Sequence, residues 1–256
     1  MPVLCLIKKQ MDNFIFGLRP VIEAIKAGKE IDRILLKKDM ASENTGELFA
    51  LIKSRGIIVQ RVPLEKLNRL TPNNHQGVIA FLSTVKYHKL DDIVTRVFDD
   101  GRDPFIVILD GITDVRNFGA IARTCDCAGV NAIVLPETGS VSVGPDAIKT
   151  SAGALLTLPV CREKNTLKAV KTLKSYGFSV IAASEKASVS YTSPDYVMPV
   201  AIVMGNEEKG ISPQVLKECS HLVSIPQFGN IQSLNVSVAT GIMVYEVVRQ
   251  RMNKKI

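Results

Sequence analysis

Three polar loops hold the residues whose types and spacing are suited to chemistry. Each loop directly follows a short apolar run, and each is rich in glycine, asparagine, serine and charged residues. In open α/β sheets, ligands collect beyond the carboxyl ends of the strands. We therefore expect one ligand site where the three loops meet. The loops are "GITDVRNFGAIART" after "FIVILD", "GNEEKGIS" after "PVAIVM", and "QFGNIQSLNVS" after "HLVSIP".

The first loop combines an asparagine with an arginine further along the same predicted helix. Asn117 is a good N-cap residue for a helix that the pattern predicts over Asn117–Ala128. The side chain of Arg123 should lean back toward the start of that helix, over Gly119, which leaves room for it. An arginine beside a helix N-terminus suits a phosphate group or a developing oxyanion. A solvated surface arginine without a ligand is the alternative interpretation.

The second loop has the glycine spacing of a phosphate-binding loop but lacks the lysine. Ile211 follows Gly210 at the position where a Walker loop needs lysine, so that assignment is excluded. The glycines still permit a ligand to approach the backbone closely. Glu207 and Glu208 can bind hydroxyl groups or an amine, although two adjacent acids are more often only solvated. A plain surface turn is the alternative.

The third loop leads into a segment that fits two patterns. Polar and apolar residues alternate from Ser233 to Val238 as in a strand, but the apolar run then continues too far for one. Length favours a long helix that continues to Met252. We expect its apolar members to pack inward, with Ser233 and Asn235 at the N-terminal mouth of the helix, pointing at the site. The expected apolar stripe is Leu234, Val238, Gly241, Tyr245 and Val248.

Two groups of strands and helices must position these loops. The first part of the chain has strand-like runs separated by helical patterns, which indicates a small α/β unit. Residues 83–104 are polar, contain one short amphipathic piece and are typical of a linker. The second part alternates apolar, strand-like runs with helical patterns. This alternation predicts an α/β domain on a buried parallel sheet.

Composition limits the class of protein. The 256 residues are 46% hydrophobic, enough for one large domain or two ordinary ones, and the formal net charge of +7 fits an anionic partner such as RNA. A merely basic soluble protein is the alternative. The 5 cysteines are scattered and the 3 histidines lie far apart, so we expect a cytoplasmic location, no disulfide framework and no metal site. No apolar run is long enough to cross a membrane.

The three loops together resemble the motifs of the SpoU (TrmH-like) family of RNA ribose 2'-O-methyltransferases, in the SPOUT superfamily. The matching stretches are "LDGITDVRNFGAIARTCDCAGV", "IVMGNEEKGIS" and "SIPQFGNIQSLNVSVATGI", of which the third is the most specific. Nearer the N-terminus, "FGLRPVIEAI" and "NHQGVIAF" resemble the ribosomal-protein-like RNA-binding domain of the RlmB type. Enzymes of that type methylate a guanosine ribose in 23S rRNA.

The resemblance implies an overall architecture. It indicates a C-terminal SPOUT-type knotted parallel-sheet methyltransferase domain, preceded by a small ribosomal-protein-like α/β RNA-binding domain. It also implies S-adenosylmethionine as the cofactor, an RNA substrate, and a homodimer with its sites near the interface. The expected boundaries are an N-terminal extension over 1–12, the RNA-binding domain over 13–84, a linker over 85–104 and the methyltransferase domain over 105–256.

The same resemblance assigns roles to individual residues. The residues expected to line the cofactor pocket, largely with backbone groups, are Gly205, Ile225 and Leu234. The residues expected to form the catalytic constellation are Asn117, Arg123, Glu207, Ser233 and Asn235.

The implied reaction moves a methyl group onto a ribose 2'-hydroxyl. Arginine stays protonated near neutral pH, so Arg123 is a poor base. It would either stabilise the developing alkoxide or clamp a substrate phosphate that helps to take the proton. Ser233 and Asn235 would hydrogen-bond the ribose or neighbouring groups and fix in-line attack. No metal is needed, because the methyl donor is already activated.

Other functions stay open alongside methylation of rRNA. A tRNA ribose is the main alternative substrate. A non-catalytic RNA-binding protein on the same scaffold is a second alternative, although the intact Asn117, Arg123 and Asn235 speak against it. A nucleotide-dependent oxidoreductase is a third, but the chain lacks the glycine-rich fingerprint and the acidic ribose ligand after it.

Overall fold

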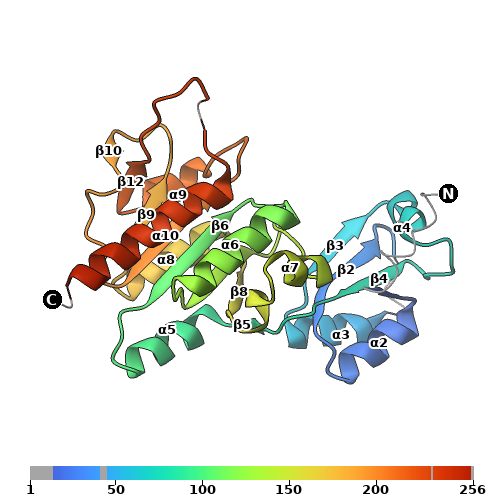
Figure 1. The fold of residues 1–256 in the computed structure, drawn as a ribbon. Helices are drawn as coiled ribbons and strands as arrows, with labels where there is room; N and C mark the ends of the chain where they lie inside the picture. The colour runs from blue at the N-terminus through green and yellow to red at the C-terminus, as the bar shows by residue number, and fades with distance from the viewer. Residues whose placement is uncertain (1–13, 41–44, 232, 255–256) are drawn as a thin grey trace. The chain divides into compact units, whose positions relative to one another are not determined.

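The computed structural model describes residues 14–40, 45–231 and 233–254, and the chain divides into two compact units (Figure 1). The first unit contains the described residues up to Val85 together with Val143–Pro145. The second contains Lys86–Ser142 and the described residues from Asp146 onward. The N-terminal extension expected over 1–12 lies outside the described residues.

The first unit is built on a four-stranded mixed sheet in the order β1-β4-β2-β3. β2 and β3 run parallel, whereas β4 pairs antiparallel with both β1 and β2. Ile34 of β2 packs with α2 and α3, while its neighbour Leu35 points to the other face and packs with Leu67 of α4. The elements are β1 Phe14–Phe16, α2 Leu18–Lys26, β2 Ile31–Lys37, α3 Gly46–Arg55, β3 Val59–Val62, α4 Leu64–Leu70 and β4 Val78–Leu82.

The second unit is built on an eight-stranded sheet in the order β10-β12-β9-β11-β6-β7-β8-β5. Every neighbouring pair in it is parallel. Its central strands are short apolar runs that are buried on both faces, as in parallel sheets covered by helices. The predicted α/β fold with a parallel sheet is therefore confirmed. The strands are β5 Tyr87–His88, β6 Phe105–Asp110, β7 Ala132–Pro136, β8 Val160–Glu163, β9 Ser179–Ala183, β10 Val189–Ser190, β11 Val200–Gly205 and β12 His221–Ser224.

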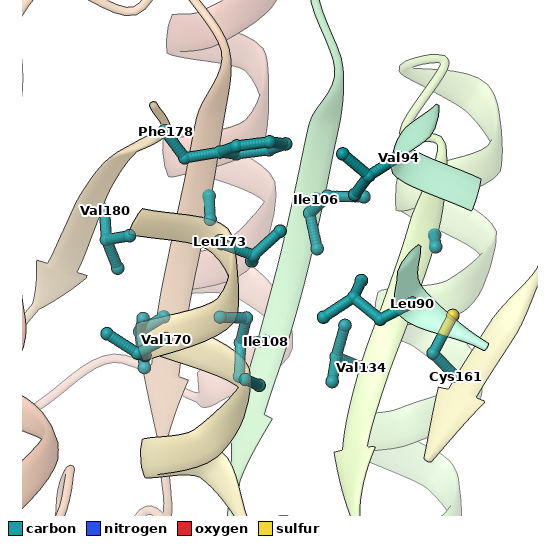
Figure 2. Close-up of a cluster of buried hydrophobic side chains, with 14 of the residues drawn as sticks. Leu90, Val94, Ile106, Ile108, Val134, Cys161, Val170, Leu173, Phe178 and Val180 are labelled. Carbon is teal, nitrogen blue, oxygen red and sulfur yellow. The ribbon is translucent and has the colours of Figure 1, made fainter. Parts of the chain in front are cut away.

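Helices cover both faces of this parallel sheet. On one face, side chains of α5, α8 and α9 form a core with Ile106 and Ile108 of β6 and Val134 of β7 (Figure 2). On the other face, α6 and α10 pack side by side (Figure 1). The helices are α5 Leu90–Asp99, α6 Val115–Cys127, α7 Pro145–Thr150, α8 Thr166–Ser175, α9 Pro213–Glu218 and α10 Val236–Asn253, with a short 3-10 helix at Ala154–Leu156.

The stretch that is typical of a linker carries ordered elements of the second unit. β5 and α5 lie within residues 85–104, and Leu90, Ile93 and Val94 of α5 belong to the core of the parallel sheet. The amphipathic piece noticed in the sequence is thus a full helix that covers the sheet. Strand β8 has no clear signal in the sequence, because it is only 4 residues long and its second half is charged.

Candidate functional site

The first two loops meet because their strands are neighbours in the sheet. β6 and β11 are in register, and their last residues, Asp110 and Gly205, are paired. The next residue, Asn206, donates from Nδ2 to the carbonyl of Gly111 at 3.0 Å, and its Oδ1 accepts two backbone N–H groups of the following turn at 2.9 and 3.1 Å. Asn206 therefore fixes the turn that carries Glu207. The sequence alone does not indicate this role of Asn206.

Gly205 is required by the close approach of the same turn. A Cβ atom at this position would lie 2.4 Å from the carbonyl carbon of Gly210 and 2.5 Å from the backbone nitrogen of Ile211. Both are backbone atoms, so no side-chain rotation relieves the overlap. The turn is closed by backbone hydrogen bonds between Asn206 and Gly210 in both directions, at 3.2 and 2.8 Å. Glycine thus allows the turn to fold back onto the end of β11.

A polar cluster joins the three loops through one oxygen atom. Oε1 of Glu207 accepts hydrogen bonds from Nδ2 of Asn117 and from Nδ2 of Asn235, each at 2.9 Å. The same oxygen accepts the backbone N–H of Val236 at 3.3 Å. Asn235 also donates to Oδ1 of Asn117 at 3.0 Å. We call Asn117, Glu207 and Asn235 the amide–carboxylate cluster.

The N-terminus of α6 differs from the expected one. Its N-cap is Asp114, whose Oδ1 accepts the backbone N–H of Asn117 at 2.8 Å, and the helix begins at Val115. Both residue types are good caps, so local preference does not separate them. Because Asn117 lies inside the first turn, its side chain is free to reach the cluster. Asn235 does cap its helix, since its Oδ1 accepts the backbone N–H of Ser237 at 2.9 Å at the start of α10.

A pocket adjoins the cluster at the carboxyl ends of β9 and β11. It is lined by Gly205, Ile225 and Leu234, the residues expected to hold a cofactor, and by Ser233 and Glu207 of the expected catalytic set. The structure thus brings together residues that are far apart in the chain. One wall comes from the end of β9. A single sequence does not predict this wall, because it does not show the order of the strands in the sheet. That wall is Ala183, Ser184 and Glu185.

Arg123 makes no hydrogen bond to the described residues of the cluster. Its side chain is exposed on α6, and no hydrogen bond or ion pair is found for it among the described residues. The expectation that Gly119 leaves room for it is wrong. A Cβ atom on Gly119 would lie 2.0 Å from Oγ1 and 2.5 Å from Cβ of Thr150, so α7 already fills that space. Gly119 admits Thr150, and Arg123 points to solvent.

Helix α10 buries a different face from the expected one. Its buried side chains are Val236, Thr240, Met243, Val244, Glu246 and Val247. Val238 and Tyr245 of the expected stripe are instead exposed, at 52% and 51%, as is Met252 at 65%. The helix is apolar on more than one side, so periodicity alone does not identify the buried face. Val238, Tyr245 and Met252 recur at heptad spacing and form one line along the helix, here called the α10 strip.

Cys125 and Cys161 of the second unit are buried. Within the described ranges, no group of three or more His, Cys, Asp or Glu side chains could hold a metal ion. Burial raises the pKa of the Cys161 thiol to about 12 and also raises the pKa of Cys125. In the same part of the chain, no helix is long and apolar enough to cross a membrane.

Two family models match the chain over most of its length. Residues 104–245 match the model described as the SpoU rRNA Methylase family. Residues 14–88 match the model described as RNA 2'-O ribose methyltransferase substrate binding. Both matches contain stretches on which the resemblance rests.

Curated relatives match nearly the whole chain. A protein of Bacillus subtilis (strain 168), assigned to the TrmH family of tRNA/rRNA methyltransferases, is 33% identical over 242 residues, which cover 94% of this chain and 97% of the relative. A protein of Staphylococcus saprophyticus with the same assignment is 36% identical over 237 residues, which cover 93% of this chain and 95% of the relative.

Solved structures agree with these relatives. The crystal structure of an AdoMet-bound rRNA methyltransferase from Sinorhizobium meliloti matches with a TM-score of 0.59 and 28% identity, covering 97% of this chain and 94% of that chain. A TrmH/SpoU tRNA modifying enzyme from A. aeolicus matches with a TM-score of 0.56 and 31% identity, covering 64% of this chain and 86% of that chain. The resemblance of the three loops is thereby confirmed, and the chain belongs to the SpoU (TrmH) family of RNA 2'-O-ribose methyltransferases.

Proposed function

We propose that the protein transfers a methyl group from S-adenosylmethionine to the 2'-hydroxyl of a guanosine ribose in 23S rRNA. The observation that carries the proposal is the amide–carboxylate cluster, which gathers residues from three loops beside a pocket at the carboxyl edge of the sheet. The AdoMet-bound rRNA methyltransferase from Sinorhizobium meliloti supports both the cofactor and the class of substrate. A tRNA ribose is the alternative, favoured by the likeness to the A. aeolicus tRNA modifying enzyme.

The chemistry of the pocket fits the cofactor. Met204, Ile225 and Leu234 offer apolar surface to the adenine ring, while Glu185 and Glu207 offer carboxylates to hydroxyl or ammonium groups. S-adenosylmethionine supplies an activated methyl group on a sulfonium sulfur when it is bound. In this proposal Gly205, Ile225 and Leu234 hold it, largely through backbone groups.

The residues of the cluster and the residues near it have different roles toward the RNA. Oε1 of Glu207 is taken by three donors, whereas no partner is found for its Oε2 in the described chain, so Oε2 is available to a substrate or cofactor hydroxyl. Ser233 is exposed at the pocket and positions the ribose. Arg123 acts as a cation, which holds a phosphate or stabilises the charge that develops on the 2'-oxygen. Asn117 and Asn235 fix the carboxylate.

The exposed α10 strip supports a homodimer. Val238, Tyr245 and Met252 are large apolar side chains that lie in one line on a helix surface. Burying such surface contributes about 25 cal/mol per Å². Leu234, which lines the pocket, is itself 37% exposed at the start of this helix. A second subunit on the strip would therefore adjoin the pocket.

Further parts of the proposal concern the rest of the chain. The first unit binds the RNA, which the description of its matching family model supports. Its boundary with the methyltransferase domain lies before β5, because α5 is part of the second core. The knot implied by the family resemblance and a cytoplasmic location belong to the same proposal.

Methyl transfer from tritiated S-adenosylmethionine to purified 23S rRNA, 16S rRNA and tRNA tests the proposal. We expect label in 23S rRNA, at a position that resists alkaline cleavage because its 2'-oxygen is blocked. Label in tRNA alone would change the substrate but keep the reaction. The absence of S-adenosylmethionine binding in calorimetry would favour the non-catalytic RNA-binding protein instead.

A further inference from the structure

A second polar pocket lies in the first unit and contains none of the expected catalytic or cofactor-binding residues. It is a hollow of about 530 Å³, within the range of roughly 300–1,000 Å³ that small ligands occupy. Its walls come from the end of β2, from α4 and from the loop between α4 and β4. Its lining includes Lys37, Asp39, Leu64, Asn68, Asn74, His75 and Gln76. We call this hollow the amide pocket.

His75 fixes the orientation of Asn68. The histidine is only 7% exposed, and its Nδ1 accepts the backbone N–H of Gly77 at 3.0 Å. In the neutral ring Nε2 then carries the proton, so it donates to Oδ1 of Asn68 at 2.9 Å. The amide oxygen of Asn68 is therefore in use. Its NH2 group has no partner among the described residues.

Two further amides are oriented in the same way. The backbone N–H of Leu18 donates to Oε1 of Gln76 at 3.0 Å, and the backbone N–H of Gln76 donates to Oδ1 of Asn74 at 3.3 Å. Gln76 has a φ of 51°, a left-handed conformation that residues other than glycine rarely adopt. In each case a backbone donor takes the amide oxygen and leaves the NH2 group free within the described chain. The pocket is thus lined by three exposed amide side chains whose oxygens are held and whose NH2 groups have no partner within the described chain.

The rest of the lining selects the kind of ligand. Lys37, at the end of β2, adds a positively charged donor, and Asp39 adds a carboxylate that can accept from a base NH2 group. Leu64 is 38% exposed and adds apolar surface. Amide donors, one charge of each sign and an apolar surface match a ligand that has acceptor oxygens, donor groups and a flat apolar face. A nucleotide has all three properties.

We propose that the amide pocket holds one unpaired nucleotide of the RNA substrate, with its base against Leu64 and its phosphate or base oxygens on the amide donors and Lys37. The inference deepens the proposed function and rests on it, because it says how that substrate is gripped. An unpaired nucleotide fits better than a duplex. Bases inside double-stranded RNA are stacked and difficult to reach, whereas unpaired bases splay out into protein pockets.

The test uses fluorescence anisotropy of the full chain with a short, labelled, single-stranded RNA of mixed sequence. The double variant Asn68→Asp/Asn74→Asp keeps the oxygen that each internal hydrogen bond needs and replaces the free NH2 donor by a second oxygen. We expect it to bind about tenfold or more weakly, because lost hydrogen bonds to charged or polar groups are of that size. Lys37→Gln leaves the amide network intact and should also weaken binding.

A matched control separates the pocket from general electrostatics. Lys29→Gln/Lys53→Gln lowers the formal net charge of +7 by the same amount, at exposed positions outside the pocket. We expect the affinity of this control variant for the RNA to fall by less than about threefold, which is the part due to non-specific attraction. Wild-type protein should also prefer the single strand to a duplex of the same sequence.

Equal losses in the two double variants, or equal wild-type affinity for single strand and duplex, would overturn the proposal. Failure of the proposed function is detected separately. Binding of S-adenosylmethionine, measured by calorimetry, should be the same in wild type and variants. If the wild type does not bind it, the reaction assignment fails, while the comparison of RNA affinities still decides the role of the amide pocket.

Discussion

The amide–carboxylate cluster and the amide pocket use the same kind of side chain in opposite ways. In the second unit, the NH2 groups of Asn117 and Asn235 both donate to Glu207, so these amide donors are used within the amide–carboxylate cluster. In the first unit, histidine and backbone donors occupy the oxygens of Asn68 and Asn74, and the NH2 groups are left over.

The difference shows that the chemistry of an amide depends on which of its ends the fold has already used. A network that closes on itself holds chain segments in place, which suits a site where two reacting groups must be aligned. Amides that are anchored by their oxygens keep their donors for a ligand. Amino-acid composition does not distinguish the amide–carboxylate cluster from the amide pocket, because the segments that carry them are all rich in asparagine and glycine.

The largest effect on activity is expected for Arg123, which belongs neither to the amide–carboxylate cluster nor to the amide pocket. We expect Arg123→Ala to lower methyl transfer by about 10²–10³-fold, the loss typical of one preorganised donor at a developing oxyanion. Melting temperature and S-adenosylmethionine binding should not change, since the side chain is exposed. Arg96→Ala, at an exposed position of α5, is the control for a lost positive charge. Normal turnover by Arg123→Ala would remove this residue from the site.

A smaller effect is expected from Gly205→Ala, because the added Cβ atom would overlap the turn that carries Glu207 of the amide–carboxylate cluster. The added Cβ meets the backbone of Gly210, so we expect the free energy of unfolding to fall by about 1–3 kcal/mol. Cofactor binding should weaken as well, because the pocket shares this turn. Gly46→Ala, where no atom lies within 4 Å of the new Cβ, should be nearly neutral in the same urea titrations. Similar losses in both variants would contradict the close-approach argument.

The same substitution in both clusters tests the comparison directly. Asn117→Asp replaces an NH2 donor that lies 2.9 Å from Oε1 of Glu207 by an oxygen. We expect this to cost about 1 kcal/mol of unfolding free energy at neutral pH. Asn74→Asp should stay within about 0.5 kcal/mol, since its NH2 group has no partner to lose. Equal costs would mean that the two clusters do not differ as described.

The smallest effect is a pattern of thiol labelling that reports on α6, the helix that carries Asn117. Cys127 is exposed on this helix, whereas Cys125 is buried and burial raises its pKa. We expect iodoacetamide to label Cys127 quickly in the folded protein and to leave Cys125 and Cys161 unlabelled, as read by peptide mass spectrometry. Rapid labelling of Cys125 under native conditions would show that α6 opens, and that the closed cluster does not hold it.

Sequence reasoning predicts much of the fold because buried parallel strands appear as continuous apolar runs, as β6 and β11 do. It misses β8, whose short length and charged end carry no such signal. It selects Asn117 instead of Asp114 as the cap, because only the tertiary hydrogen bond to Glu207 distinguishes two residues with similar local preferences. It places the residues of the pocket by resemblance, and the strand order that assembles them comes from the structure.

The face of α10 teaches the same lesson. Apolar residues surround this helix, so its sequence is compatible with several inward faces, and the contacts with α6 and β11 decide between them. The strip of Val238, Tyr245 and Met252 is left outside. The sequence of α10 therefore shows more than one apolar face but does not show which of them is buried within the subunit.

One oxygen of Glu207 closes long stretches of the chain on themselves. Its partners Asn117 and Asn235 lie 90 and 28 positions away, and these two asparagines, which also bond each other, are 118 positions apart. Contacts at such separations form late in folding, because loop-closure entropy is lost before the contact compensates for it. During synthesis, the cluster is therefore absent until α10 has been made and seated, and an unfinished copy of the protein lacks the arrangement that the proposed reaction requires.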